Sequence, residues 1–123
     1  MANASLKNKL NKLKDDGFFD NLVIKRGVEK EFFRVNKNGY ISKKSHPESL
    51  GSALTNRYIT TDFAEAQVEL VTPVFEDVNA LYDFLYSLHV FVAQNIDKNE
   101  MLWPFSMPPK IKKESDINLG FYH

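Results

Sequence analysis

Acidic or polar residues occupy every second position in two stretches of the sequence, with Glu29 and Glu31 in the first and Glu65, Gln67 and Glu69 in the second. In the second stretch the intervening residues are apolar. Alternate side chains of a β-strand point to opposite faces, so this spacing predicts one acidic face and one apolar face. If the two strands share a sheet, Glu29, Glu31 and Glu69 converge on one face. Asp62 precedes the second strand and then lies next to the end at which that strand begins.

Four carboxylates on one face repel each other unless a cation compensates their charge. Oxygen ligands suit a hard divalent cation, and Mg²⁺ fits better than Zn²⁺ because the chain has no cysteine and only three histidines. The same spacing is also typical of the solvated outer face of an ordinary antiparallel sheet. From spacing alone this second interpretation is favoured, and the metal site remains the alternative.

The strands that position these residues follow from local patterns. Residues 22–35 predict a first strand region, and residues 36–39, Asn-Lys-Asn-Gly, predict a tight turn because Asn and Gly tolerate positive φ. Tyr40 and Ile41 then begin a return strand. The second acidic strand should end at Pro73, since proline cannot donate a hydrogen bond to a neighbouring strand.

Two amphipathic helices are predicted. Residues 5–14 carry three leucines at helical spacing, a narrow apolar face that we expect to dock on its own domain rather than on a membrane. Residues 77–95 form the clearer helix, with Asp77 as its N-cap and an apolar face packed on the sheet. We interpret His46 as a loop residue and His89 as a hydrogen-bonded structural residue, rather than as ligands.

Composition restricts the class of protein. The chain of 123 residues, 43% of them hydrophobic, is long enough for one domain or part of one, and its pattern predicts the α+β class, an antiparallel sheet with packed helices. Sixteen basic and sixteen acidic residues cancel, which disfavours nucleic acid as a partner. No apolar run approaches the roughly 20 residues that span a bilayer, and no secretory signal is visible, so we expect a cytoplasmic protein. No nucleophile–base pair, P-loop or dinucleotide fingerprint is present, so no catalytic side chain is assigned.

Five segments of the chain resemble the N-terminal part of glutamate–cysteine ligase of the proteobacterial type. In order, they are RGVEKEFFRV (26–35), HPESLGSALT (46–55), ITTDFAEA (59–66), ELVTP (69–73) and WPFSMP (103–108). Their order and spacing match from about residue 22 to about residue 110. The resemblance is weaker outside that range.

The resemblance implies a fold, a reaction and a cofactor. Members of this family have a glutamine synthetase-like fold, in which a curved antiparallel sheet carries the active site on its concave face. They join the γ-carboxylate of L-glutamate to the amine of L-cysteine, the first step of glutathione biosynthesis. ATP phosphorylates the γ-carboxylate, the amine attacks the acyl phosphate, and Mg²⁺ ions bridge the phosphates and the reacting carboxylate.

The resemblance also implies roles for particular residues. Glu29, Glu31, Asp62 and Glu69 match the family's Mg²⁺-binding acids, and Phe63 matches a position near the pocket for the cysteine side chain. With the resemblance in hand, the metal site becomes the preferred interpretation of the acidic residues. Mg²⁺ commonly uses a few carboxylates together with substrate oxygens.

Family members are several times longer than this chain. We therefore expect residues 1–123 to be a single partial domain, the N-terminal portion of the catalytic domain, and to be inactive in isolation. The alternative is a non-catalytic module that binds a nucleotide or a protein partner. A nucleic-acid-binding domain is a third option, which the zero net charge disfavours. The oligomeric state is left open.

Overall fold

The computed structural model describes residues 2–121. Along the chain the elements are helix α1 (Ala2–Asp15), strand β1 (Glu29–Asn36), the 3₁₀ turn η1 (Glu48–Leu50), strand β2 (Ile59–Thr61), strand β3 (Gln67–Val71), helix α2 (Val78–Asn95), strand β4 (Glu100–Leu102) and the 3₁₀ turn η2 (Glu114–Asp116). None of the helices in this range is long and apolar enough to cross a lipid bilayer.

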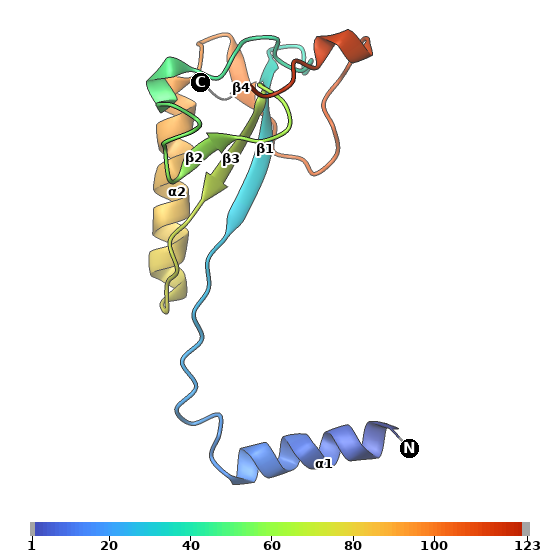
Figure 1. The fold of residues 1–123 in the computed structure, drawn as a ribbon, viewed down its shortest axis with the longest axis vertical. Helices are drawn as coiled ribbons and strands as arrows, with labels where there is room; N and C mark the ends of the chain where they lie inside the picture. Colours follow the sequence, from blue (N-terminus) through green and yellow to red (C-terminus); the bar gives the residue numbers. More distant parts are fainter. Residues whose placement is uncertain (1, 122–123) are drawn as a thin grey trace.

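The four strands form one antiparallel sheet in the order β2-β3-β1-β4. Strand β1 is the longest and lies inside the sheet, between β3 and β4. Glu31 of β1 lies opposite Glu69 of β3, and Arg34 of β1 lies opposite Leu102 of β4. Helix α2 runs alongside the sheet (Figure 1) and packs on one of its faces. This arrangement confirms the α+β class with an antiparallel sheet.

The hydrophobic core lies between the sheet and α2. Phe32 of β1 and Val68 and Leu70 of β3 are buried, and Leu88 and Val92 of α2 belong to the same buried cluster. Burying such a side chain contributes roughly 1.5–3 kcal/mol to the stability of the folded state. Burial of these side chains therefore determines which face of each strand is directed toward α2. The intervening residues of both strands must then point to the other face.

Helix α2 forms where the sequence predicted a helix, with Asp77 as its N-cap. The Asp77 carboxylate accepts a hydrogen bond from the Ala80 backbone N–H at 2.7 Å and caps the helix. His89 is a structural residue, as expected, because its Nδ1 lies 2.9 Å from the Leu85 carbonyl oxygen and its ring stacks on Phe32. The cap and the core contacts together hold α2 against the sheet.

Helix α1 forms where predicted but does not dock on the sheet or on α2. Its leucines Leu6, Leu10 and Leu13 are 59%, 49% and 37% exposed. Figure 1 shows α1 set apart from the rest of the fold by an extended stretch of chain. The expectation that this narrow apolar face packs on its own domain was wrong for the described part of the chain.

The first strand is shorter than the predicted residues 22–35 and begins at Glu29. The reason is the length of its partner, because β3 ends at Val71, opposite Glu29. Before that point the two segments are joined by hydrogen bonds between Val28 and Thr72 and by an isolated bridge between Arg26 and Phe75. Preceding residues have no strand to pair with and extend as an arm.

The predicted turn at residues 36–39 is present. Gly39 adopts a φ of 78° and donates its backbone N–H to the Asn36 carbonyl at 2.9 Å. The return strand is reduced to a single bridge between Ile41 and Val35. Strand β4, which no local pattern predicted, pairs with the end of β1 instead.

Candidate metal and substrate site

The predicted metal-binding acids lie on the side of the sheet away from α2. Glu31 of β1 and Glu69 of β3 are directly opposite each other in the antiparallel register. Glu29 lies two residues before Glu31 on the same strand and therefore on the same face. Asp62 follows the last residue of β2. We call Glu29, Glu31, Asp62 and Glu69 the acidic face.

Contacts and charge both show that the members of the acidic face are near one another. The Gln67 side-chain amide donates to Glu31 Oε2 at 2.6 Å and to Asp62 Oδ2 at 3.1 Å. Burial, followed by the charges of Asp62, Glu29 and Glu31, raises the pKa of Glu69 above its ordinary value. A carboxyl group whose neighbours oppose its ionisation is one that a cation would stabilise.

In the described part of the chain, basic side chains do not neutralise the three glutamates of this face. Within residues 2–121, Glu29, Glu31 and Glu69 form no ion pair with a lysine or arginine. Nor does this part of the chain gather three or more acidic or histidine side chains tightly enough to form a ready-made metal cage. That openness suits Mg²⁺, which usually takes one or two carboxylates and completes its shell with water and substrate phosphates.

The end of the described chain braces the segment that carries Asp62. Leu119 forms an antiparallel bridge with Ala64, and the Gly120 backbone N–H donates to the Phe63 carbonyl at 2.8 Å. A Cβ atom on Gly120 would lie only 2.5 Å from the Asp62 carbonyl oxygen. The residue at position 120 must therefore be glycine for the two segments to approach this closely.

Glu65 does not join the acidic face, although its position in the alternation predicted that it would point there. It is buried before β3 begins, and its carboxylate accepts from the backbone N–H groups of His46, at 2.6 Å, and Phe121. His46 is in a loop, as predicted, and its Nδ1 lies 2.8 Å from Thr61 Oγ1. Burial, followed by the positive charge of Arg34, lowers the pKa of His46.

Arg34 is fully buried and joins four segments of the chain. Its guanidinium donates to both carboxylate oxygens of Glu100, at 2.9 and 3.1 Å. It also donates to the backbone carbonyls of Lys44, Ser45 and Glu65 at 2.8–2.9 Å. These contacts tie β1 to β4, to the loop at residues 44–45 and to the segment just before β3.

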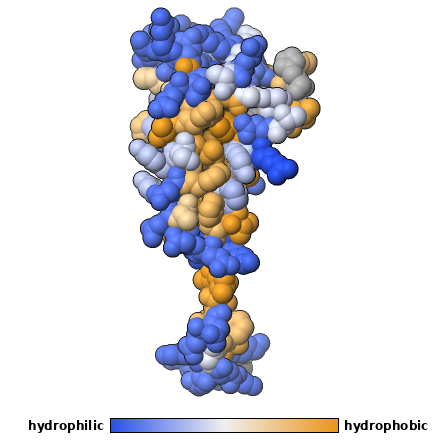
Figure 2. All heavy atoms as spheres, turned by 90° about the vertical axis from the view of Figure 1, so that its left-hand side faces the viewer, coloured by the Kyte–Doolittle hydropathy of each residue, from blue (hydrophilic) through white to orange (hydrophobic). Residues whose placement is uncertain are grey.

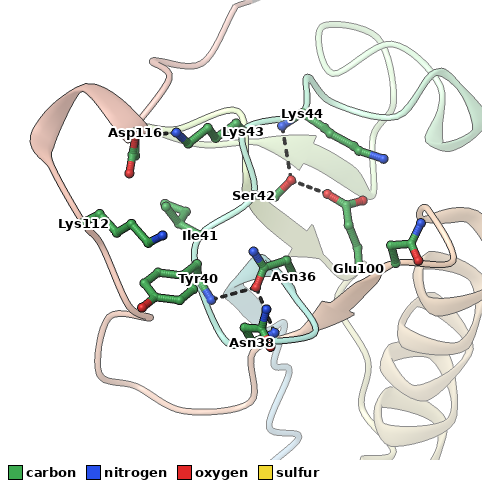
Figure 3. A pocket seen from close by; sticks show the side chains of 11 residues that line it. Asn36, Asn38, Tyr40, Ile41, Ser42, Lys43, Lys44, Glu100, Lys112 and Asp116 are labelled. Carbon is green, nitrogen blue, oxygen red and sulfur yellow. Dashed lines mark hydrogen bonds and ion pairs between the residues drawn. The ribbon is translucent and has the colours of Figure 1, made fainter.

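Phe63, the predicted substrate residue, is 67% exposed beside Asp62. Neither of the two pockets described in residues 2–121 contains Phe63 or a member of the acidic face. One, of about 550 Å³, is lined by residues that include His46, Glu65 and Phe121. Figure 3 shows the other, of about 390 Å³, where Lys43 pairs with Asp116 at 2.6 Å. Over the described residues, the candidate site is thus an open face of the sheet, outside both of these pockets.

Comparison with known proteins decides the family. The family model described as glutamate-cysteine ligase matches residues 9–123. The chain belongs to the glutamate–cysteine ligase family. The match covers every segment that carried the resemblance in the sequence.

Individual members of the glutamate–cysteine ligase family are similar over most of the chain. Glutamate–cysteine ligases of Yersinia pseudotuberculosis, Erwinia tasmaniensis and Sodalis glossinidius are 48%, 46% and 48% identical over 99 residues, or 80% of this chain. Those 99 residues are 19% of each relative, so the chain spans about a fifth of the length of the curated ligases it matches.

Two solved structures are also similar. Glutamate–cysteine ligase of Francisella tularensis, crystallised in complex with AMP, has a TM-score of 0.78 and 33% identity over 80% of this chain and 20% of its own. A bifunctional glutathione synthetase from Pasteurella multocida has a TM-score of 0.73 and 35% identity over 76% of this chain and 13% of its own. The fold described above is therefore the fold of the corresponding part of these enzymes.

Several residues that shape the site in this ligase-family chain were not found from the sequence. Arg34 carried a signal, because it falls in the apolar phase of β1, where a charge needs a buried partner. Its partner Glu100 and the bracing residue Gly120 lie far along the chain and gave no local signal. Gln67 was recognised only as a polar residue of the strand.

Proposed function

We propose that this chain is the N-terminal portion of the catalytic domain of a glutamate–cysteine ligase and supplies part of its Mg²⁺ site. The reaction joins the γ-carboxylate of L-glutamate to the amine of L-cysteine in glutathione biosynthesis. The γ-carboxylate attacks the γ-phosphorus of ATP and releases ADP, and the amine then displaces phosphate from the acyl phosphate. Support comes from one observation above all: in a chain of this family, Glu31 and Glu69 lie opposite each other, and within residues 2–121 neither forms an ion pair with a lysine or arginine.

The proposed work of Glu29, Glu31, Asp62 and Glu69 is to hold Mg²⁺. When bound, Mg²⁺ offsets the charge on the phosphate oxygens during phosphoryl transfer. The sheet keeps three of the carboxylates on rigid strands, and the bridge at Ala64 holds the turn that carries Asp62. This rigidity lets the carboxylates meet the cation and the nucleotide without a large rearrangement.

Two features support the proposed substrates. The Francisella ligase was crystallised in complex with AMP, which supports a nucleotide as one of the substrates. Phe63 presents an exposed aromatic ring next to Asp62, and we assign it to the pocket for the cysteine side chain. An apolar ring suits the weakly polar thiol better than a charged group would.

The wider setting follows from the same family membership. We infer that residues 1–123 form one partial domain and that their four strands belong to a larger, glutamine synthetase-like sheet. Both outer strands, β2 and β4, are only three residues long. A cytoplasmic location without nucleic-acid or membrane partners stays a prediction.

The direct test is turnover of the full-length enzyme that carries this chain. Glu31→Gln and Glu69→Gln should each abolish formation of γ-glutamylcysteine while the folded structure is retained by circular dichroism. Glu76→Gln is the matched control, because Glu76 is exposed and pairs only with Lys25 at 3.4 Å. Normal turnover in both site variants would refute the metal-binding role.

A second candidate function is a non-catalytic module that binds a protein partner. Figure 2 shows hydrophobic side chains gathered in a band along the side of the molecule where α2 lies. On α2, Val78, Tyr82 and Tyr86 are 57%, 64% and 59% exposed at four-residue steps. Absence of turnover in the parent, together with loss of partner binding in a folded Tyr82→Ser/Tyr86→Ser variant, would favour this alternative.

A further inference from the structure

The side chain of Gln67 lies between two members of the acidic face. One amide nitrogen donates to Glu31 Oε2 at 2.6 Å and to Asp62 Oδ2 at 3.1 Å. These two acids come from different parts of the sheet, β1 and the turn after β2. Gln67 is the first residue of β3, between them in the strand order.

The backbone of Gln67 is itself held in place. Its N–H donates to the Ala64 carbonyl at 2.8 Å, and its carbonyl accepts from the Asp62 N–H at 3.3 Å. Ala64 is in turn bridged to Leu119. The amide therefore extends from a fixed point in the hairpin, and its two hydrogen bonds set where the carboxylates lie.

A neutral amide is well suited to this position. Each N–H presents a partial positive charge to a carboxylate, and a hydrogen bond to a charged group is stronger than one between neutral groups. The amide thereby offsets part of the repulsion between the two carboxylates. Unlike a lysine, it does so without a full positive charge that would repel a cation.

We propose that Gln67 is a positioning residue for the cation site, which links Glu31 to Asp62 before the cation arrives. This inference rests on the proposed function. The two hydrogen bonds use Glu31 Oε2 and Asp62 Oδ2, which is one of the two oxygens of each carboxylate. Gln67 therefore orients both carboxylates without occupying all of their oxygens. Gln67 thus orients the metal ligands in the way that hydrogen-bond partners of ligands commonly do.

The test uses Mn²⁺ as a paramagnetic probe that binds oxygen ligands like Mg²⁺, with electron paramagnetic resonance to measure its affinity. Gln67→Met keeps the length of the side chain and removes both donors, and it should weaken Mn²⁺ binding about tenfold. Gln94→Met is the matched control, since Gln94 is exposed on α2. It should leave the affinity unchanged. Both variants and the parent are measured in the full-length enzyme.

The outcomes are distinguishable. If the parent binds Mn²⁺ and Gln67→Met binds it equally well or more tightly, the positioning role is overturned while the cation site stands. If the parent binds no Mn²⁺, or binds it equally well after Glu31→Gln, the proposed cation site fails and the inference fails with it.

A second measurement needs no variant at position 67 and covers the case in which Gln67→Met does not fold. In the nuclear magnetic resonance spectrum of the parent, bound Mn²⁺ should broaden the side-chain amide signal of Gln67 before that of Gln94. Equal broadening of the two signals would overturn the proposal.

Discussion

Replacing Glu69 with glutamine should stabilise the cation-free chain and remove its response to Mg²⁺. Glu69 lies directly opposite Glu31, and like charges opposed across two strands cost roughly 0.2–1 kcal/mol. Burial of the Glu69 carboxyl group and the charges of Asp62 and Glu29 oppose its ionisation as well. We therefore expect the variant to gain about 0.5–1 kcal/mol in the free energy of unfolding.

A bound cation should reverse this difference. Mg²⁺ with ATP at a hundredfold excess over its Kd would stabilise the parent by about 2.7 kcal/mol, because a ligand that binds only the folded state adds its binding free energy to stability. The variant lacks one carboxylate and should gain far less. Thermal unfolding of both chains, with and without Mg²⁺–ATP, measures the reversal. A change of 1 kcal/mol moves Tm by about 2–8 °C for chains of this size.

The pH dependence supplies an independent check. The pKa of Glu69 is raised in the folded chain, so the folded state binds this proton more readily than the unfolded state does. The parent therefore loses stability as the pH rises from the ordinary glutamate range, near 4.3, through the folded-state pKa. The advantage of Glu69→Gln should be largest above that pKa and vanish at lower pH. An advantage that is absent at pH 7, or independent of pH, would refute the reasoning.

Three further predictions concern the residues that support the site. Arg34→Met should lower the free energy of unfolding by about 3–5 kcal/mol, because it leaves Glu100 buried without its partner, and chemical denaturation should show that Arg34→Met/Glu100→Leu recovers most of the loss. Gly120→Ala should cost about 1–3 kcal/mol in the same assay, since its Cβ would overlap the Asp62 carbonyl; an unchanged midpoint would contradict that contact. His46 has a lowered pKa, so the folded state resists protonation and stability should fall as the pH drops through about 6.5. His46→Gln should flatten the stability–pH curve between pH 7 and 5, and a parallel curve would count against this role.

The acidic face could be predicted from the sequence because its determinants are local. The alternation around Glu31 and Glu69 specifies which side chains share a face of each strand, and the register then places them opposite each other. Helix α2 could also be predicted from the sequence, since Asp77 caps it and its apolar residues repeat at helical spacing. A role as metal ligands became the preferred interpretation of all four acids only through the family resemblance, since their spacing also fits a solvated face.

What the sequence did not reveal depends on contacts between distant residues. Glu65 continues the alternation of β3 backwards, yet the strand begins two residues later and Glu65 turns inward to meet His46 and Phe121. Strand β4 has only three residues, and these residues form a strand because they pair with β1. Such elements are specified by their partners, and no local window of sequence contains both sides of the pairing.

The place of β1 in the sheet has a consequence during synthesis. Strand β1 leaves the ribosome before either of its neighbours, and Glu100, which begins β4, follows Arg34 by 66 residues. At 5–20 residues per second, this part of β1 waits roughly 3–13 s for its last partner. Over that interval the nascent strand has an unpaired edge that another chain could join. Lys30 and Arg34 place positive charges on the face of β1 that carries Phe32, and inward-pointing charges of this kind disfavour pairing with another chain, so Arg34, which is buried against Glu100 in the finished fold, also disfavours wrong pairing before that fold forms.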